Sequence, residues 1–125
     1  MSSSNQNDLK IAFVDLENVG TLKKIDLAAY AYAVVLVGAR QHQVTLGSNS
    51  ACPLMVIKVP DHSGPADKRP KHNLDFHLAY YLGRYDTIVR PGVTFEVISS
   101  DRGFLALVGH IAANGRVCIQ IEGQE

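Results

Sequence analysis

Short apolar segments recur along the chain and alternate with segments that are polar or have helical spacing. Five of the apolar segments are continuous or nearly so and rich in β-branched residues, as is typical of strands buried on both faces. They lie at residues 9–14, 33–37, 54–59, 93–98 and 117–121. Because parallel sheets bury both faces of their strands, this pattern predicts five strands in a mainly parallel sheet.

The clearest helical spacing follows Asn73, a residue type that favours the N-cap position. Leucines recur there at every fourth position and predict a helix over residues 74–84, with Gly83 near its end. A second apolar stripe predicts a helix over residues 105–112. Asn114-Gly115 is a strong signal that this second helix stops there.

The remaining segments carry weaker signals. A loose apolar pattern predicts a helix over residues 21–32, with Thr21 as its N-cap. Residues 40–50 fit either a helix or a loop. Residues 61–72 contain three prolines and a glycine, counting Pro60 at the boundary, and predict a loop without regular structure.

Strands that alternate with helices predict βαβ units with right-handed crossovers. The predicted fold class is therefore α/β, a three-layer α/β/α arrangement with a mainly parallel five-stranded Rossmann-like sheet. In the common strand order 3-2-1-4-5, the first and fourth strands are neighbours at the topological switch point. Ligands of such sheets bind at the carboxyl ends of these two strands.

Composition and length limit the class of protein. The 125 residues, 46% hydrophobic and 19% charged, suit one compact domain over residues 9–125, preceded by a disordered polar tail at 1–8. No apolar run approaches the roughly 20 residues of a membrane span. The two cysteines lack metal-site spacing, which favours reduced thiols and a cytoplasmic location. Because the net charge is zero, any basic patch is local.

Three carboxylates are placed to meet at the switch point. Asp15 ends the first predicted strand and Asp101 follows the fourth, while Asp75 stands in the first turn of the helix before it. Three converging carboxylates repel each other unless a cation lies between them. Hard oxygen ligands suit Mg²⁺ or Mn²⁺, which can activate water for phosphodiester hydrolysis. The alternative is that Asp15 only caps the next element and that Asn18-Val19-Gly20 is a turn.

The predicted loop over residues 61–72 is the most basic stretch of the chain. It holds Lys68, Arg69 and Lys71, with His72 beside them. These side chains are placed to contact the phosphates of a nucleic acid near the acidic site. The alternative is a solvated loop without a partner.

Three motifs together resemble the PIN-like nucleases, especially their NYN-type branch. They are Asp15-Leu16-Glu17-Asn18, Asn73-Leu74-Asp75-Phe76-His77 and Ser99-Ser100-Asp101-Arg102-Gly103-Phe104, and the resemblance runs from residue 11 to about residue 121. It implies a PIN-like domain acting as a divalent-metal-dependent ribonuclease on single-stranded RNA. Because relatives often dimerise, a homodimer is also considered. The family's catalytic residues map to Asp15, Asn18, Asp75 and Asp101, its metal ligands to the three aspartates, and its small polar residues to Ser99 and Ser100.

One position departs from the family pattern. Many relatives carry a further acid two residues after the last aspartate, where this chain has Gly103. Glu17 is a candidate auxiliary acid that compensates for it. The departure favours, as an alternative function, a PIN-like module that binds RNA or a protein partner without cutting.

Other members of this fold class fit less well. A haloacid-dehalogenase-like phosphatase needs an aspartate where Glu17 stands, and a receiver domain needs one at the end of the third strand, where Val59-Pro60-Asp61 is a poor match. A nucleotide-binding Rossmann domain needs GxGxxG after the first strand, which is absent. The histidines lack metal-ligand spacing, and Tyr80, Tyr81 and Tyr85 are expected to pack the helix.

Overall fold

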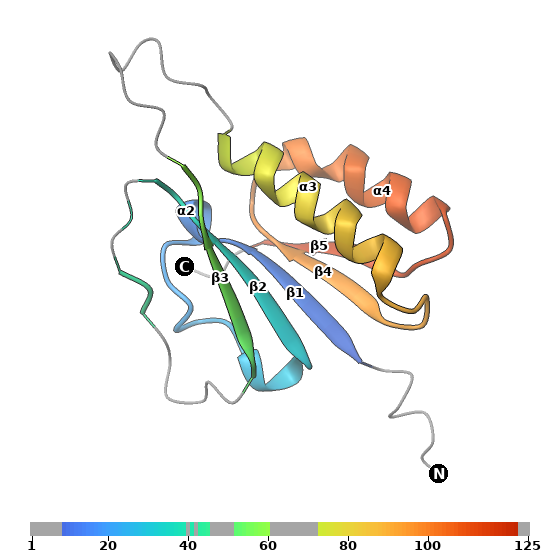
Figure 1. The fold of residues 1–125 in the computed structure, drawn as a ribbon, viewed down its shortest axis with the longest axis horizontal. Coiled ribbons are helices and arrows are strands. Elements are labelled where there is room, and N and C mark those ends of the chain that lie inside the picture. The colour runs from blue at the N-terminus through green and yellow to red at the C-terminus, as the bar shows by residue number, and fades with distance from the viewer. Residues whose placement is uncertain (1–8, 40, 42, 46–51, 61–72, 123–125) are drawn as a thin grey trace.

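Five parallel strands form a single sheet in the described part of the chain. The computed structural model describes residues 9–39, 41, 43–45, 52–60 and 73–122. The strands are β1 (Lys10–Asp15), β2 (Tyr32–Val37), β3 (Leu54–Lys58), β4 (Thr94–Ile98) and β5 (Cys118–Ile121). Their order is β3-β2-β1-β4-β5, and every neighbouring pair is parallel (Figure 1). The predicted fold class and strand order are confirmed.

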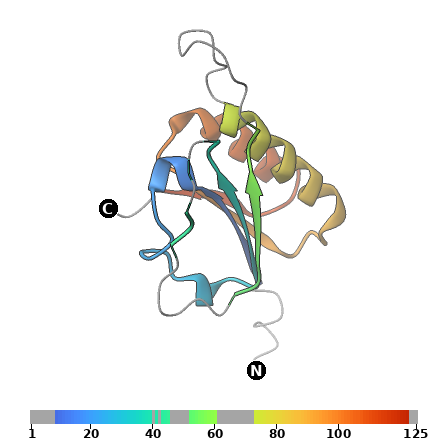
Figure 2. The ribbon, with the colours of Figure 1, turned by 60° about the vertical axis from the view of Figure 1, so that its left-hand side comes forward.

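Helical elements cover both faces of the sheet. The long helices α3 (Asn73–Ile88) and α4 (Leu105–Ala113) lie together on one face (Figure 1). The short elements α2 (Leu16–Val19) and η1 (Leu27–Ala29) lie on the other face (Figure 2). A single 3₁₀ turn, η3 (Arg102–Phe104), joins β4 to α4. The second layer is therefore thinner than the first.

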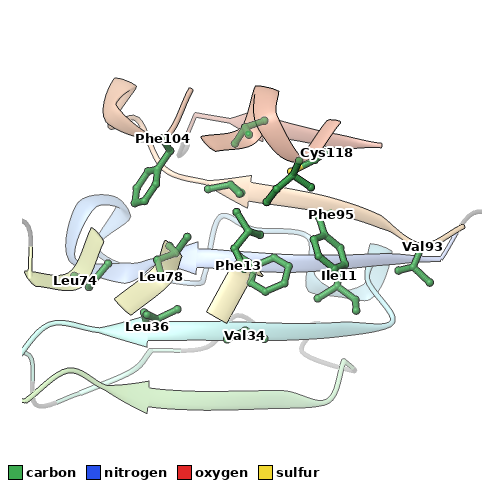
Figure 3. Close-up of a cluster of buried hydrophobic side chains, with 14 of the residues drawn as sticks. Ile11, Phe13, Val34, Leu36, Leu74, Leu78, Val93, Phe95, Phe104 and Cys118 are labelled. Carbon is green, nitrogen blue, oxygen red and sulfur yellow. The ribbon is translucent and has the colours of Figure 1, made fainter. Parts of the chain in front are cut away.

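The larger core lies between the sheet and the long helices. Ile11 and Phe13 of β1 point into it, because alternate residues of a strand share one face. On the helix side, the core contains Leu74, Leu78 and Leu82 of α3, which are all almost completely buried. Figure 3 shows Phe13 and Phe95 next to each other in this core. Their ring centroids are 4.9 Å apart. Asp15 follows Phe13 by two positions and so belongs to the same face of the sheet.

The opposite face is covered by irregular chain, and the predicted helix over 21–32 is wrong. Only η1 is helical there. Thr21 accepts a hydrogen bond from the backbone N–H of Lys23 (3.2 Å), which makes a local turn. The backbone N–H of Leu22 donates to the carbonyl of Thr45 (3.1 Å) instead of to a helical partner. Leu22 and Leu27 both reach the core, although five residues apart, a spacing that a helix does not place on one face.

The helix α3 runs four residues beyond its predicted end at residue 84 and continues past Gly83. An added Cβ at Gly83 meets no atom within 4 Å, so this glycine lies in open space and serves no turn. Tyr85 and Val89 pack against the core beyond it, and this packing continues the helix. The stop at Asn114-Gly115 is confirmed, because α4 ends at Ala113 and Gly115 has a φ of +107°.

The described helices and the two cysteines can be compared with what the sequence predicts. No described helix has both the length and the apolar character needed to span a membrane. The two cysteines are free and buried, and burial raises the pKa of Cys118 to about 11. Its thiol therefore stays protonated at neutral pH and acts as a small apolar side chain.

Candidate functional site

The carboxyl ends of β1 and β4 place two candidate residues side by side. Val14 pairs with Ile98 in the parallel register, so Asp15 and Ser99 are the next residues on the two strands. Both side chains are buried, Asp15 being 3% exposed and Ser99 fully covered. Ser99 donates its hydroxyl proton to Asp15 Oδ2 (2.9 Å). The predicted meeting of the first and fourth strands therefore brings these two residues into direct contact.

Asp15 also begins the short helix that follows it. Its Oδ1 accepts a hydrogen bond from the backbone N–H of Asn18 (3.2 Å), so Asp15 is the N-cap of α2. The capping alternative foreseen from the sequence is thus present in the structure. It leaves room for the other role, because a carboxylate oxygen has two lone pairs and each oxygen of Asp15 accepts one bond here.

Asp101 is tied to the same serine. Ser99 Oγ accepts the backbone N–H of Asp101 (3.0 Å) while it donates to Asp15. Asp101 Oδ1 in turn accepts the backbone N–H of Gly103 (2.8 Å) and caps η3. A single hydroxyl therefore sets the spacing between the first and fourth strand-end acids.

Asn18 joins α2 to the same loop. Its side-chain oxygen accepts the backbone N–H of Ser100 (2.8 Å). This bond spans 82 positions of sequence and links the carboxyl ends of β1 and β4. Asn18 and Ser100, predicted as catalytic and auxiliary residues, are thus brought together, with Ser100 contributing its backbone.

The electrostatics at Asp15 are unfavourable for a carboxylate. Burial raises its pKa above the ordinary value of 3.8, and the bonds from Ser99 and Asn18 offset only part of this rise. The negative charges of Glu17 and Asp101 raise the pKa further. No cation contributes to this balance among the described residues. Hard oxygen donors that repel one another suit a divalent cation such as Mg²⁺ or Mn²⁺.

Asp75 lines a cavity of about 440 Å³ between α3 and the start of α4. Asp75 and Asp101 both line this cavity, so Asp101 belongs both to the cavity and to the group around Asp15. Within the described residues, no three acidic, histidine or cysteine side chains are grouped closely enough to hold a metal ion. The role of Asp75 as a third metal ligand therefore stays a prediction.

Glu17 lies on the β2 side of Asp15. Its carboxylate lies against Gly38. A Cβ added at that glycine would collide with Glu17 Oε2. Gly38 directly follows β2, so the carboxylate lies at the carboxyl ends of the strands. Glu17 is exposed, which suits an auxiliary acid better than a structural one.

Two glutamines that the sequence reasoning missed hold these strand ends. Gln120 of β5 donates from its Nε2 to the carbonyls of Ser99 and Asp101, at 2.8 Å each. Gln41 accepts the backbone N–H of Gly38 (2.7 Å) and donates to the carbonyl of Leu16 (3.1 Å). A signal for Gln120 exists in the sequence, because it is the one polar residue within the apolar strand 117–121.

Several candidate residues complete the account. The basic residues Lys68, Arg69 and Lys71, together with His72, lie outside the described residues. Tyr81 and Tyr85 pack against the larger core, as expected. Tyr80 contacts Tyr81 edge-on but is 57% exposed, so the expectation that it packs the helix holds only in part.

Comparison with known proteins supports the same family. No curated protein and no solved structure gave a significant match to the chain. The family model of the PIN domain matches residues 9–121, which is nearly the whole chain and includes all five strands. The chain therefore belongs to the PIN domain family.

Proposed function

We propose that this protein is a divalent-metal-dependent ribonuclease of the NYN type. PIN domains are typically nucleases and generally use divalent metal ions. The NYN assignment rests on the three motifs that contain Asp15, Asp75 and Asp101. The substrate is single-stranded RNA, whose phosphodiester bonds are hydrolysed.

One observation carries this proposal. Asp15 is a buried carboxylate whose neighbours, among the described residues, are two neutral hydrogen-bond donors and two further acids. A protein that needs this side chain only as a helix cap gains nothing from surrounding it with negative charge, since an uncharged serine or asparagine caps a helix equally well. A carboxylate kept in such surroundings is expected at a functional site.

The residues have distinct tasks in the proposed reaction. Asp15 and Asp101 are the residues that would hold the ion through carboxylate oxygens, and Asp75, which shares a cavity with Asp101, would be the third ligand. Ser99 keeps Asp15 and Asp101 in fixed positions by bonding both. When bound, the ion would supply activation of a water molecule and stabilisation of negative charge at the phosphate. Asn18 and Ser100 keep α2 and the loop after β4 together through their hydrogen bond.

The test compares cleavage of single-stranded RNA in Mg²⁺ or Mn²⁺ by the wild type, Asp15→Asn and Asp101→Asn. Both variants are expected to lose cleavage while they remain folded. The matched control is Asp26→Asn, because Asp26 is an exposed aspartate whose side chain makes no cap bond. Full cleavage by either site variant, or equal loss in the control, would overturn the proposal.

A second function is favoured by Gly103. Its backbone N–H holds Asp101 Oδ1, and an added Cβ at this position would lie 3.1 Å from that same oxygen. A larger residue, such as the acid found in many relatives, would therefore press on Asp101. A chain that lacks this acid is a candidate for binding RNA without cutting it. RNA binding with no cleavage in either metal would establish this second function.

A further inference from the structure

We propose that the cavity beside the acidic site takes an unpaired nucleobase, which stacks on the ring of Phe76. This inference rests on the proposed function, because it assigns a subsite for the RNA that the acidic site would cut. Phe76 stands on α3 directly after Asp75. It lines the cavity of about 440 Å³ to which Asp75 and Asp101 also belong.

The exposure of Phe76 is the first argument. Its side chain is 70% exposed, while the three leucines of the same helix are almost completely buried. A large apolar ring in water costs free energy that packing on the core would have avoided. Phe76 lies between the buried positions 74 and 78 and so faces away from the core. Its exposed ring is thus available to a ligand.

The walls of the cavity give the second argument. Phe104, Leu107 and Ala79 supply an apolar surface, and Asp75 and Asp101 supply two carboxylates. None of the described residues that line the cavity carries a positive charge, so its walls offer no partner to an anionic occupant such as an acidic peptide. A nucleobase is flat and uncharged, and its π face stacks on an aromatic side chain regardless of its sequence identity.

The position of the cavity selects a base over other neutral ligands. Asp101 lies in both the cavity and the group that would bind the scissile phosphate. Each phosphate in RNA is joined through a sugar to a base. A cavity next to the phosphate site is therefore within reach of a base from an adjacent nucleotide. A paired base is stacked inside a helix and cannot reach a side chain this way, so the base must be unpaired.

The experiment measures binding of end-labelled single-stranded RNA by fluorescence anisotropy, with Ca²⁺ in place of Mg²⁺ and intact RNA checked on a gel. The RNA series carries one abasic nucleotide at each position in turn. Loss of stacking on one base is expected to weaken binding by the wild type about five- to hundred-fold at one position. Phe76→Ala is expected to bind intact RNA weakly and to lose this dependence on position, and Phe76→Tyr is expected to keep it.

The control is Tyr80→Ala, which removes an exposed aromatic ring one turn further along α3 that does not line the cavity. Equal binding by Phe76→Ala and wild type, or an equal loss in Tyr80→Ala, overturns the inference. A position-dependent loss that persists in Phe76→Ala also overturns it, as does the absence of any RNA binding.

Cleavage in Mn²⁺, measured beside binding, separates this inference from the proposed function. Binding that depends on Phe76 without any cleavage supports the subsite and overturns the ribonuclease. Cleavage that is insensitive to Phe76 supports the ribonuclease and overturns the subsite, which would then be open to a partner protein's apolar side chain. Because Phe76 is mostly exposed, Phe76→Ala is expected to melt like the wild type, and this is checked first.

Discussion

The protein buries a charged residue at each end of its sheet, and the two are treated in opposite ways. At the amino end, Arg116 precedes β5 and is 4% exposed. Its guanidinium pairs with Asp86 (2.6 Å) and lies over the Phe95 ring, 4.1 Å from the centroid. It also donates to four backbone carbonyls, those of Asp86, Val89, Arg90 and Val93. This charge is fully compensated.

At the carboxyl end, Asp15 is equally buried but receives no such compensation from the described residues. Its two bonds come from neutral donors, and the nearby charges are of its own sign. Arg116 closes the end of α3 and the turn into β4, which is a structural task. The charges near Asp15 are negative, which a structural role does not require and which the proposed metal site would explain. Burial alone therefore does not separate the two roles, whereas the sign of the neighbouring charge does.

The largest expected effect comes from breaking the compensated end. Arg116→Met keeps the apolar stem but leaves the Asp86 carboxylate and four carbonyls without their donor. Removing one partner of a buried pair costs several kcal/mol, and because Asp86 is partly exposed we expect about 3 kcal/mol. Denaturant unfolding measures this loss. A change below about 1 kcal/mol would show that Arg116 is replaceable and would remove the basis of the comparison.

Ser99→Ala is expected to have the next largest effect, at the uncompensated end. The hydroxyl is buried and bonds both Asp15 and the backbone of Asp101, so the substitution removes both of these bonds. We expect a cost of about 1–3 kcal/mol in stability. The pKa of Asp15 should rise further, since this bond lowers it. Unfolding and the NMR titration of Asp15 measure the two effects, and an unchanged Asp15 titration would contradict the assigned bond.

The fold was predictable because its signals are local and redundant. Each strand is a continuous apolar run, and every strand begins and ends within one residue of its predicted bounds. The parallel order then brings Asp15 beside the β4 end by topology alone. The prediction of a helix over residues 21–32 was wrong because the apolar residues of this segment reach the core from irregular backbone. Helical periodicity does not describe such a segment.

The closeness of the β1 and β4 ends was predictable from the sequence, whereas the hydrogen bonds that connect them were not. Asp15 and Asp101 are drawn together through Ser99, whose hydroxyl is shared by groups far apart in sequence. Gln120 escaped notice because a polar residue in a short edge strand is ordinarily solvent-facing. Phe76 was not predicted as a site residue. Helical spacing shows that a residue faces away from the core, but it does not show that a cavity lies beside that residue.

Gln120→Met tests whether a side chain of β5 holds the loop that carries Ser99 and Asp101 in place. Gln120 bonds the carbonyls of Ser99 and Asp101 from one amide nitrogen, so its loss should cost about 1–2 kcal/mol. RNA cleavage should fall more than stability suggests, because small displacements of catalytic groups reduce rates strongly. The control is Gln43→Met, at an exposed glutamine. Equal cleavage by both variants would limit Gln120 to a structural role.

Asp15→Asn should have the smallest effect on stability, and the opposite sign. Asparagine keeps the cap bond from Asn18 and removes a buried charge that lies near Glu17 and Asp101. Without metal, the variant should melt at an equal or higher temperature than the wild type. A raised pKa means that the folded protein binds the Asp15 proton more tightly than the unfolded chain does. The stability of the wild type should therefore fall as pH rises from 3.8 through the raised pKa, and the variant should lack this decrease.

Melting curves with and without Mn²⁺ complete this test. A cation that binds the folded protein raises the melting temperature by mass action, so Mn²⁺ should stabilise the wild type and do so much less in Asp15→Asn. If Asp15 is only a cap, Asp15→Ala should cost about 1 kcal/mol while Mn²⁺ shifts all three proteins alike. That result would show that Asp15, like Arg116, has a structural role. The proposal of a metal site at the carboxyl end of the sheet would then be wrong.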